Sequence, residues 1–269
     1  MNIRYKLTLI PGIIFLLIPS ISEAKNLLVP FTVQAPNSIW VQPWRDACEE
    51  TSIAMVNNFY QGNLVRNITK NNAKKDILQI LKIKETKWGK SLDEDAKKVV
   101  ELINNFLPWE ARIVENPTLE DIKNEIDNEQ PVIIPVYGRA LNNKYFRNGG
   151  PIYHMLVISG YDEEKKEFIT QEPGTIRGLD FRYSYDKLLN AIHDFVPQNK
   201  TQSGPKNAIF TSKEITNSAE IDADNDGLNK IEEINYGSIS WLKDSDGDGY
   251  NDGTEVRNGY SPIKKFETL

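Results

Sequence analysis

The spacing of apolar residues changes once along this chain, near residue 130. Before that point apolar positions recur every three or four residues, as on the buried face of a helix. They predict helices over residues 48–60, 71–81, 91–106 and 118–129. Ser91 and Glu94 form the pattern of a capping box at the start of the third helix, and Thr118 is a predicted cap of the fourth.

Continuous apolar runs replace this pattern after residue 130. Val132–Tyr137 and residues 153–158 are rich in β-branched and aromatic side chains, which predicts two buried strands. A charged turn at residues 163–167 leads into a third predicted strand over residues 168–170, and a last helix is predicted over residues 184–195. Helices first and an antiparallel sheet second predict an α+β domain.

The first 24 residues have the pattern of a secretory signal peptide. Arg4 and Lys6 precede a 12-residue apolar core over residues 7–18, and residues 22–24 form a small-x-small cleavage site. We expect cleavage after Ala24 and a secreted or extracytoplasmic protein. No apolar run reaches the roughly 20 residues that span a bilayer, so no membrane span is expected. Association with the cell surface is compatible with export.

A polar stretch interrupted by Pro197, Gly204 and Pro205 divides the exported chain. We predict a domain over residues 25–196, a linker over 197–220, a small module over 221–262 and a tail over 263–269.

The negative charge of the chain is concentrated near its C-terminus. The formal net charge is −6, yet residues 220–255 alone carry eleven acidic side chains against Lys230 and Lys243, a net charge of −9. The rest of the chain is therefore close to neutral, and it has no basic stripe. We do not expect a nucleic-acid partner.

An internal repeat with a period of 22 residues accounts for this acidity. Each copy follows the D-x-D-x-D-G-(x5)-E pattern, whose carboxylates converge on Ca²⁺ around a glycine turn. The predicted ligands are Asp222, Asp224, Asp226 and Glu233 in the first copy and Asp244, Asp246, Asp248, Asp252 and Glu255 in the second.

The period is too short for the flanking helices of an EF-hand. The segment instead resembles bacterial thrombospondin type-3 repeats. Lys230 occupies position nine of the first copy, where the second copy has Asp252, which predicts a weaker first calcium site.

Cys48 is the single cysteine of the 269 residues, and it opens the helix predicted over residues 48–60. A thiol in the first turn of a helix lies near the positive end of the helix dipole and near unpaired backbone N–H groups, which favour the thiolate. Asp46 is a candidate cap of this helix. We therefore predict that Cys48 is a nucleophile of low pKa. The alternative is a buried free cysteine that packs as a small apolar side chain.

A cysteine hydrolase also needs an imidazole base and a side chain that orients it. His193 lies among apolar residues of a predicted helix, whereas His154 begins a predicted strand after a glycine-rich loop, so His154 is the predicted base. Across the predicted hairpin, Glu172 faces the start of the His154 strand and is the predicted orienting residue. Gln171, on the opposite face, is the alternative.

Four segments of the chain together resemble the papain-like cysteine peptidases of the bacteriocin-processing, double-glycine peptidase-like type; they are residues 29–34, 47–52, 154–162 and 172–175. The resemblance covers about residues 27–195. It implies a papain-like fold, hydrolysis of peptide bonds and a glutamine that stabilises the oxyanion. Gln34 is favoured for that role, and Gln42, six residues before Cys48, is the alternative.

The chain departs from the family pattern in two places. Glu172 stands where the family usually has aspartate, which lengthens the orienting arm by one methylene. Glu49 and Glu50 follow the cysteine, where Gly-Pro is common.

Three functions are compatible with these patterns. The first is a secreted cysteine peptidase that uses a Cys-His-Glu triad on a peptide or protein substrate and carries a Ca²⁺-stabilised module. The second is a non-catalytic surface or adhesion protein in which a decayed peptidase-like domain binds peptide or glycan. The third is amide or acyl transfer by the same thiol, because fold and triad do not determine the acceptor.

Overall fold

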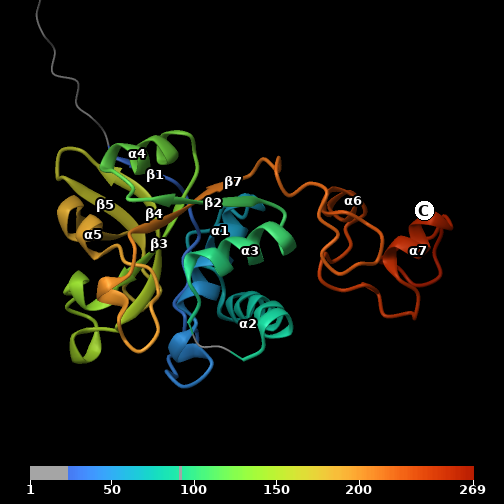
Figure 1. Ribbon diagram of the computed structural model, residues 1–269, viewed down its shortest axis with the longest axis horizontal. Helices are drawn as coiled ribbons and strands as arrows, with labels where there is room; N and C mark the ends of the chain where they lie inside the picture. Colours follow the sequence, from blue (N-terminus) through green and yellow to red (C-terminus); the bar gives the residue numbers. More distant parts are fainter. Residues whose placement is uncertain (1–23, 91–92) are drawn as a thin grey trace, which may run out of the picture.

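The computed structural model describes residues 24–90 and 93–269. In this part of the chain, seven strands form one antiparallel sheet (Figure 1). Its order is β2 (Glu110–Glu115), β7 (Asn207–Ser212), β3 (Val132–Tyr137), β4 (Tyr153–Asp162), β5 (Glu167–Gln171) and β6 (Phe181–Ser184), with β1 (Lys25–Asn26) paired to the end of β4. All ten residues of β4 are buried, so this strand forms the centre of the core.

Helices pack around the sheet in two groups. α1 (Cys48–Tyr60) packs against β4 and α2 (Lys70–Trp88), and α3 (Ala96–Phe106) packs against β2 and α2. Figure 1 shows these three helices together on one side. α4 (Leu119–Asp127) contacts β1, β3 and β4, while α5 (Tyr185–Ala191) contacts β5 and β6. Short 3-10 turns are η1 (Trp44–Asp46), η2 (Gly138–Leu141), η3 (Arg147–Gly149) and η4 (Thr201–Ser203).

The helical spacing located the helices of the first half but not all of their ends. α1 has the predicted bounds, while α2 runs on to Trp88. α3 begins at Ala96, later than predicted, because the Asp95 side chain accepts the Lys98 N–H and caps it. Ser91 of the predicted capping box lies outside the described residues. α4 has a capping box formed by Thr118 and Asp121.

The prediction of a linker over residues 197–220 is wrong in its middle part. Residues 207–212 form β7, which pairs with all of β2 and with the start of β3. Ala208, Ile209 and Phe210 are buried in the core. Three apolar residues are too few to indicate a strand from the sequence alone. They form a strand here because β7 pairs with β2 on one edge and with β3 on the other. The first domain therefore continues through β7.

The C-terminal segment carries α6 (Lys230–Tyr236) and α7 (Asp252–Arg257), at the far right of Figure 1. It is fastened to the first domain by Lys230, which is 1% exposed. Its Nζ donates hydrogen bonds to Asn104 O at 3.0 Å, Trp109 O at 2.9 Å and Ser218 Oγ at 3.0 Å. Burial lowers the pKa of Lys230 to about 8. This lysine is therefore a structural anchor.

Residues 1–23 of the predicted signal peptide lie outside the described residues. Among the residues that the structure does describe, we find no helix with both the length and the apolar character needed to cross a membrane.

Candidate active site

Cys48 is the first residue of α1, as predicted, and is 3% exposed. Ala47 is the N-cap residue, so no side chain caps the helix at that position. The prediction of Asp46 as the cap is wrong: its carboxylate accepts a hydrogen bond from Gln42 Nε2 within the turn that precedes α1. The first backbone N–H groups of α1 are thus left for another acceptor.

His154 and Glu172 form a buried pair across the hairpin of β4 and β5. His154 lies on β4 opposite Val136 of β3, and Glu172 follows the last residue of β5. The imidazole Nε2 lies 2.5 Å from Glu172 Oε1, and the two side chains are 2% and 0% exposed. The structure thus brings together the two residues that the hairpin register predicted. Nδ1 is the ring nitrogen that remains for another partner.

Both oxygens of Glu172 are held by further donors. Oε1 accepts the Gly174 N–H at 2.8 Å, and Oε2 accepts the Tyr183 hydroxyl at 2.9 Å. Asn143 Nδ2 in turn donates to the Tyr183 oxygen at 2.7 Å. Sequence reasoning missed Tyr183 and Asn143, because they come from β6 and from the loop after η2 and no local pattern marks them. The carboxylate is therefore fixed in place by its surroundings.

The ring of His154 is also confined by apolar and backbone contacts. Phe146 meets it edge to face, with ring centroids 5.6 Å apart and an interplanar angle of 84°. A Cβ at Gly174 would lie 2.8 Å from the Phe146 ring and 3.2 Å from His154 Cε1, so only glycine fits between them. These contacts leave the imidazole little freedom to turn.

The glutamines occupy different surroundings. Gln34 is 4% exposed; its Nε2 donates to Trp44 O at 3.1 Å and to Arg45 O at 2.7 Å, and its own backbone N–H donates to Pro173 O at 3.0 Å. Gln34 thus connects the turn before Cys48 with the residue after Glu172. Gln42 is exposed. Gln171 Nε2 donates to Asp180 Oδ1 at 3.0 Å.

The family model described as "Peptidase_C39 like family" matches residues 26–199, which is more than half of the chain. This chain belongs to the Peptidase_C39 like family. The membership covers Cys48, His154 and Glu172, and it supports a cysteine-peptidase domain built from helices and an antiparallel sheet.

One solved structure similar to this C39-like chain is that of a Bacillus anthracis protein provisionally assigned as a C39-like peptidase. It is 18% identical, with a TM-score of 0.47, and the match covers 72% of this chain and 100% of that one. None of the curated proteins compared with this chain matches it.

In this C39-like domain, the thiol of Cys48 is surrounded by carboxylates. Its Sγ donates to Glu49 Oε2 at 3.1 Å. Burial raises the pKa of Cys48 well above its ordinary value, and the charges of Glu49 and Asp93 raise it further. The prediction of a low pKa is therefore wrong for the protein without substrate. The helix dipole is outweighed by desolvation and by acidic neighbours that the sequence pattern did not place.

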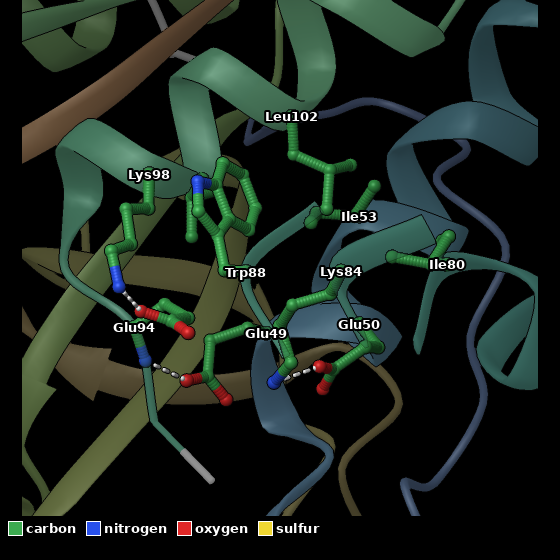
Figure 2. Close-up of a pocket in the computed structure, with 10 residues that line it drawn as sticks. Glu49, Glu50, Ile53, Ile80, Lys84, Trp88, Glu94, Lys98 and Leu102 are labelled. Carbon is green, nitrogen blue, oxygen red and sulfur yellow. Dashed lines mark hydrogen bonds and ion pairs between the residues drawn. The ribbon is translucent and has the colours of Figure 1, made fainter. Parts of the chain in front are cut away.

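A small pocket beside Glu49 is lined by further charged side chains (Figure 2). It lies between α1, α2 and α3 and has a cavity volume of about 10 Å³, room for about one water molecule. Lys84 of α2 pairs with Glu50, and Lys98 of α3 pairs with Glu94 at 2.7 Å. Burial and the charge of Glu50 raise the pKa of Glu49 to about 8. The pocket is too small to hold a substrate.

The acidic repeat folds into two loops of similar geometry. Carboxylate oxygens of Asp222, Asp224 and Asp226 lie within 4.8 Å of one another, as do those of Asp244, Asp246 and Asp248. The first aspartate of each loop accepts backbone N–H groups three, four and five positions along: Asn225, Asp226 and Gly227 in one, and Gly247, Asp248 and Gly249 in the other.

Asp252 lies between the two loops: its carboxylate accepts hydrogen bonds from Ser245 N at 2.7 Å and Ser245 Oγ at 2.6 Å in the second loop. Its carboxylate groups with Asp226 and Glu233 of the first loop, within 4.8 Å, and Gly253 N donates to Asp226 Oδ2 at 3.1 Å. Lys230, which we expected to weaken the first site, points into the first domain instead. The N-terminus of α7 packs against the first loop, so the carboxylate of Asp252 is next to both loops.

Proposed function

We propose that this protein is a cysteine peptidase in which Cys48 is the nucleophile, His154 its base and Glu172 the residue that orients the base. The observation that carries the proposal is the buried contact of 2.5 Å between His154 Nε2 and Glu172 Oε1, on a strand packed against the helix that starts at Cys48. A carboxylate with three donors around it, one of them the imidazole, holds a histidine in a single tautomer and orientation.

The proposed reaction follows from the free ring nitrogen. The thiol proton of Cys48 moves to His154 Nδ1, and the sulfur forms a bond to the carbonyl carbon of the substrate. The carbon–nitrogen bond then breaks, and the imidazolium returns the proton to the leaving amine. Water deprotonated by His154 hydrolyses the thioester, which releases the acid and restores the thiol.

The oxyanion of the intermediate needs hydrogen-bond donors close to the sulfur. Backbone N–H groups at the start of α1 suit this role, because no side chain caps them at Ala47. Gln34 is the proposed side-chain donor. To serve, its Nε2 has to release one of the carbonyls of Trp44 and Arg45 to which it now donates. Gln42 is a weaker choice, since its Nε2 donates to Asp46.

The proposal is tested by incubating the full chain with a library of unstructured peptides and identifying products by mass spectrometry. Because Cys48 is the only thiol, methyl methanethiosulfonate blocks it selectively and dithiothreitol restores it. We expect cleavage that disappears on blocking and returns on reduction. Absence of cleavage, or cleavage that survives blocking, would overturn the proposal.

One observation favours a second candidate function. The hydrogen bond of the Cys48 thiol is made to Glu49, as in a protein whose cysteine has no catalytic role. In that case the domain binds peptide or glycan at the cell surface, and His154 with Glu172 only stabilises the sheet. Peptides retained on immobilised protein, uncleaved and indifferent to blocking of the thiol, would support this candidate.

We also propose that residues 221–262 bind two Ca²⁺ ions. The proposed ligands are Asp222, Asp224, Asp226 and Glu233 with Asp252 for the first loop, and Asp244, Asp246, Asp248 and Glu255 for the second. Three observations support a cation: both carboxylate oxygens of Asp224, Oδ2 of Asp246 and Oε2 of Glu255 lack hydrogen-bond partners although they are buried atoms. Burial and the neighbouring aspartates raise the pKa of Asp224 to about 7, a repulsion that a bound cation would relieve.

Removal of calcium is expected to unfold the module but not the first domain. Two Ca²⁺ ions offset four of the nine net negative charges of residues 220–255, so binding free energy becomes folding free energy. In trypsin digestion of the full chain, EDTA should open cleavage at Lys243 and Arg257 while β2 to β7 stay protected. Export would supply the millimolar calcium that suits sites of about 10⁻⁴ to 10⁻³ M.

A double variant shows which loop is responsible for the protection by calcium. Asp244→Ala with Asp246→Ala should remove calcium protection at the second loop, whereas Glu214→Ala, an exposed acid outside both loops, should change nothing. Equal cleavage in EDTA and in calcium would contradict the calcium proposal.

A further inference from the structure

We propose that Glu49 is a positioning residue for the nucleophile: its carboxylate holds the Cys48 thiol in the resting protein and sets the pH at which the thiolate forms. The catalytic meaning of this role rests on the peptidase function proposed above. The contact itself is in the structure, where Cys48 Sγ donates to Glu49 Oε2 at 3.1 Å.

The Glu49 carboxylate cannot easily turn away from the sulfur. Its other oxygen, Oε1, accepts the backbone N–H of Glu94 at 2.9 Å, a bond drawn in Figure 2. Glu49 is 2% exposed, so losing that bond would leave a buried acceptor unpaired. The segment before α3 therefore clamps one oxygen while the other faces the thiol.

Charged and titratable groups face this pair from every element around it. Those that act on Cys48 or Glu49 directly are Glu50 on α1, Lys84 on α2, Asp93 before α3 and Tyr153 on β4. Asp46 and Glu94 act on Asp93, and Lys98 of α3 pairs with Glu94. Lys84 forms its ion pair with Glu50. The charge of Lys84 also acts on Glu49 and opposes the effects of burial and Glu50 on its pKa, and Glu49 is the acid that contacts the sulfur.

The position of Glu49 determines the direction in which its charge shifts the ionisation of the Cys48 thiol. Burial and the charge of Glu50 raise the pKa of Glu49 to about 8, so Glu49 is largely ionised by the pH at which a free thiol ionises, about 8.5. An ionised Glu49 accepts the thiol proton and repels a thiolate, so both effects favour the neutral thiol. A neutral thiol is also the form that resists oxidation, which is useful to an unpaired cysteine in an exported protein. In the proposed peptidase, Glu49 and His154 therefore compete for the Cys48 thiol, and attack on a substrate requires the sulfur to leave Glu49.

Glu49→Gln removes the charge of the Glu49 side chain and keeps its shape. The amide oxygen can still accept the Glu94 N–H, while Nε2 faces the sulfur and can donate to a thiolate. We expect the inflection in the rate of iodoacetamide alkylation against pH to move down by about one unit or more. The variant should also oxidise faster in hydrogen peroxide. Glu101→Gln on α3, whose side chain is 42% exposed, removes the same charge and should leave the inflection unchanged.

The wild-type protein supplies a test that needs no variant. Its native inflection should lie above that of the same chain unfolded in urea, near the free-thiol value of about 8.5. A native inflection at or below the unfolded one overturns the proposal. If Glu49→Gln does not fold, Glu49→Asp keeps the charge but withdraws it from the sulfur, and an unmoved inflection in that variant also overturns it.

Alkylation does not require peptide hydrolysis, so the two proposals fail separately. A lowered inflection in Glu49→Gln without any hydrolysis by the wild type supports the role of Glu49 on the thiol and overturns the peptidase function. Hydrolysis by the wild type with an unmoved inflection overturns only the role of Glu49. When both proposals hold, the acidic limb of the pH profile of peptide hydrolysis in Glu49→Gln should shift in the same direction as the inflection of its alkylation rate.

Discussion

Replacing His154 with alanine is expected to lower peptide hydrolysis by roughly 10³- to 10⁶-fold, the range found when the base of a nucleophile–base pair is removed. The reason is that the Cys48 thiol is neutral at rest and needs an acceptor for its proton. The measurement is kcat/KM on whichever peptide the library identifies, with thermal unfolding as the check on folding.

The non-additivity of the pair provides the control. If Cys48 and His154 act as a unit, the double variant Cys48→Ala with His154→Ala should be no less active than either single variant. The alternative base, His193, donates a hydrogen bond from Nδ1 to Gly204 O at 2.9 Å, and His193→Ala should keep most of the activity. Full activity in His154→Ala would remove His154 from the mechanism.

Removing the Glu172 carboxylate is expected to have the second-largest effect. Glu172→Ala should lower turnover by roughly 10- to 10⁴-fold, because the imidazole loses the group that fixes its tautomer and orientation. The truncation also leaves the Gly174 N–H and the Tyr183 hydroxyl without their acceptor, so some stability is lost. Glu172→Gln keeps the shape of the side chain and removes only its charge. Comparing its turnover with that of Glu172→Ala separates the effect of the charge from that of the shape.

Two further variants distinguish the role of the Glu172 carboxylate from the role of the groups that donate hydrogen bonds to it. Glu172→Asp restores the arm length usual in the resembling peptidases and should retain activity. Tyr183→Phe removes one donor from Oε2 and should cost about tenfold or less, since Gly174 still holds Oε1. Unchanged turnover in Glu172→Ala would instead move the orienting role to Gln171 or to no residue.

The fold was predictable where local patterns are strong. The apolar spacing of residues 48–60 gave the bounds of α1, and the β-branched run gave β3. β7 was missed because its three buried apolar residues form a strand only between β2 and β3. β2 itself has the sequence Glu-Ala-Arg-Ile-Val-Glu, in which charge obscures the alternation. Pairing between distant segments, which a local pattern does not record, made these strands.

The same distinction between local patterns and distant contacts applies to the candidate site. His154 and Glu172 could be paired because one hairpin joins them. Its register sets Val157 opposite Gln171, so Glu172 lies just beyond the last pair and within reach of His154. The carboxylates around Cys48 could not be placed, because Asp93 approaches from a distant segment and burial is a property of the whole domain. The contact of Asp252 with Asp226 and Glu233 could not be predicted either, because those two residues belong to the other loop of the repeat.

The proposed function depends on Cys48 acting as a nucleophile assisted by His154. Its most direct test is covalent labelling with a peptide that carries an electrophilic carbonyl, with the modified residue located by mass spectrometry. A bound probe places its electrophile next to the sulfur, so native protein should react much faster than urea-unfolded protein in spite of the raised pKa of the resting thiol. His154→Ala should lose that advantage. Native labelling no faster than unfolded labelling, or equal labelling in His154→Ala, would contradict the claim.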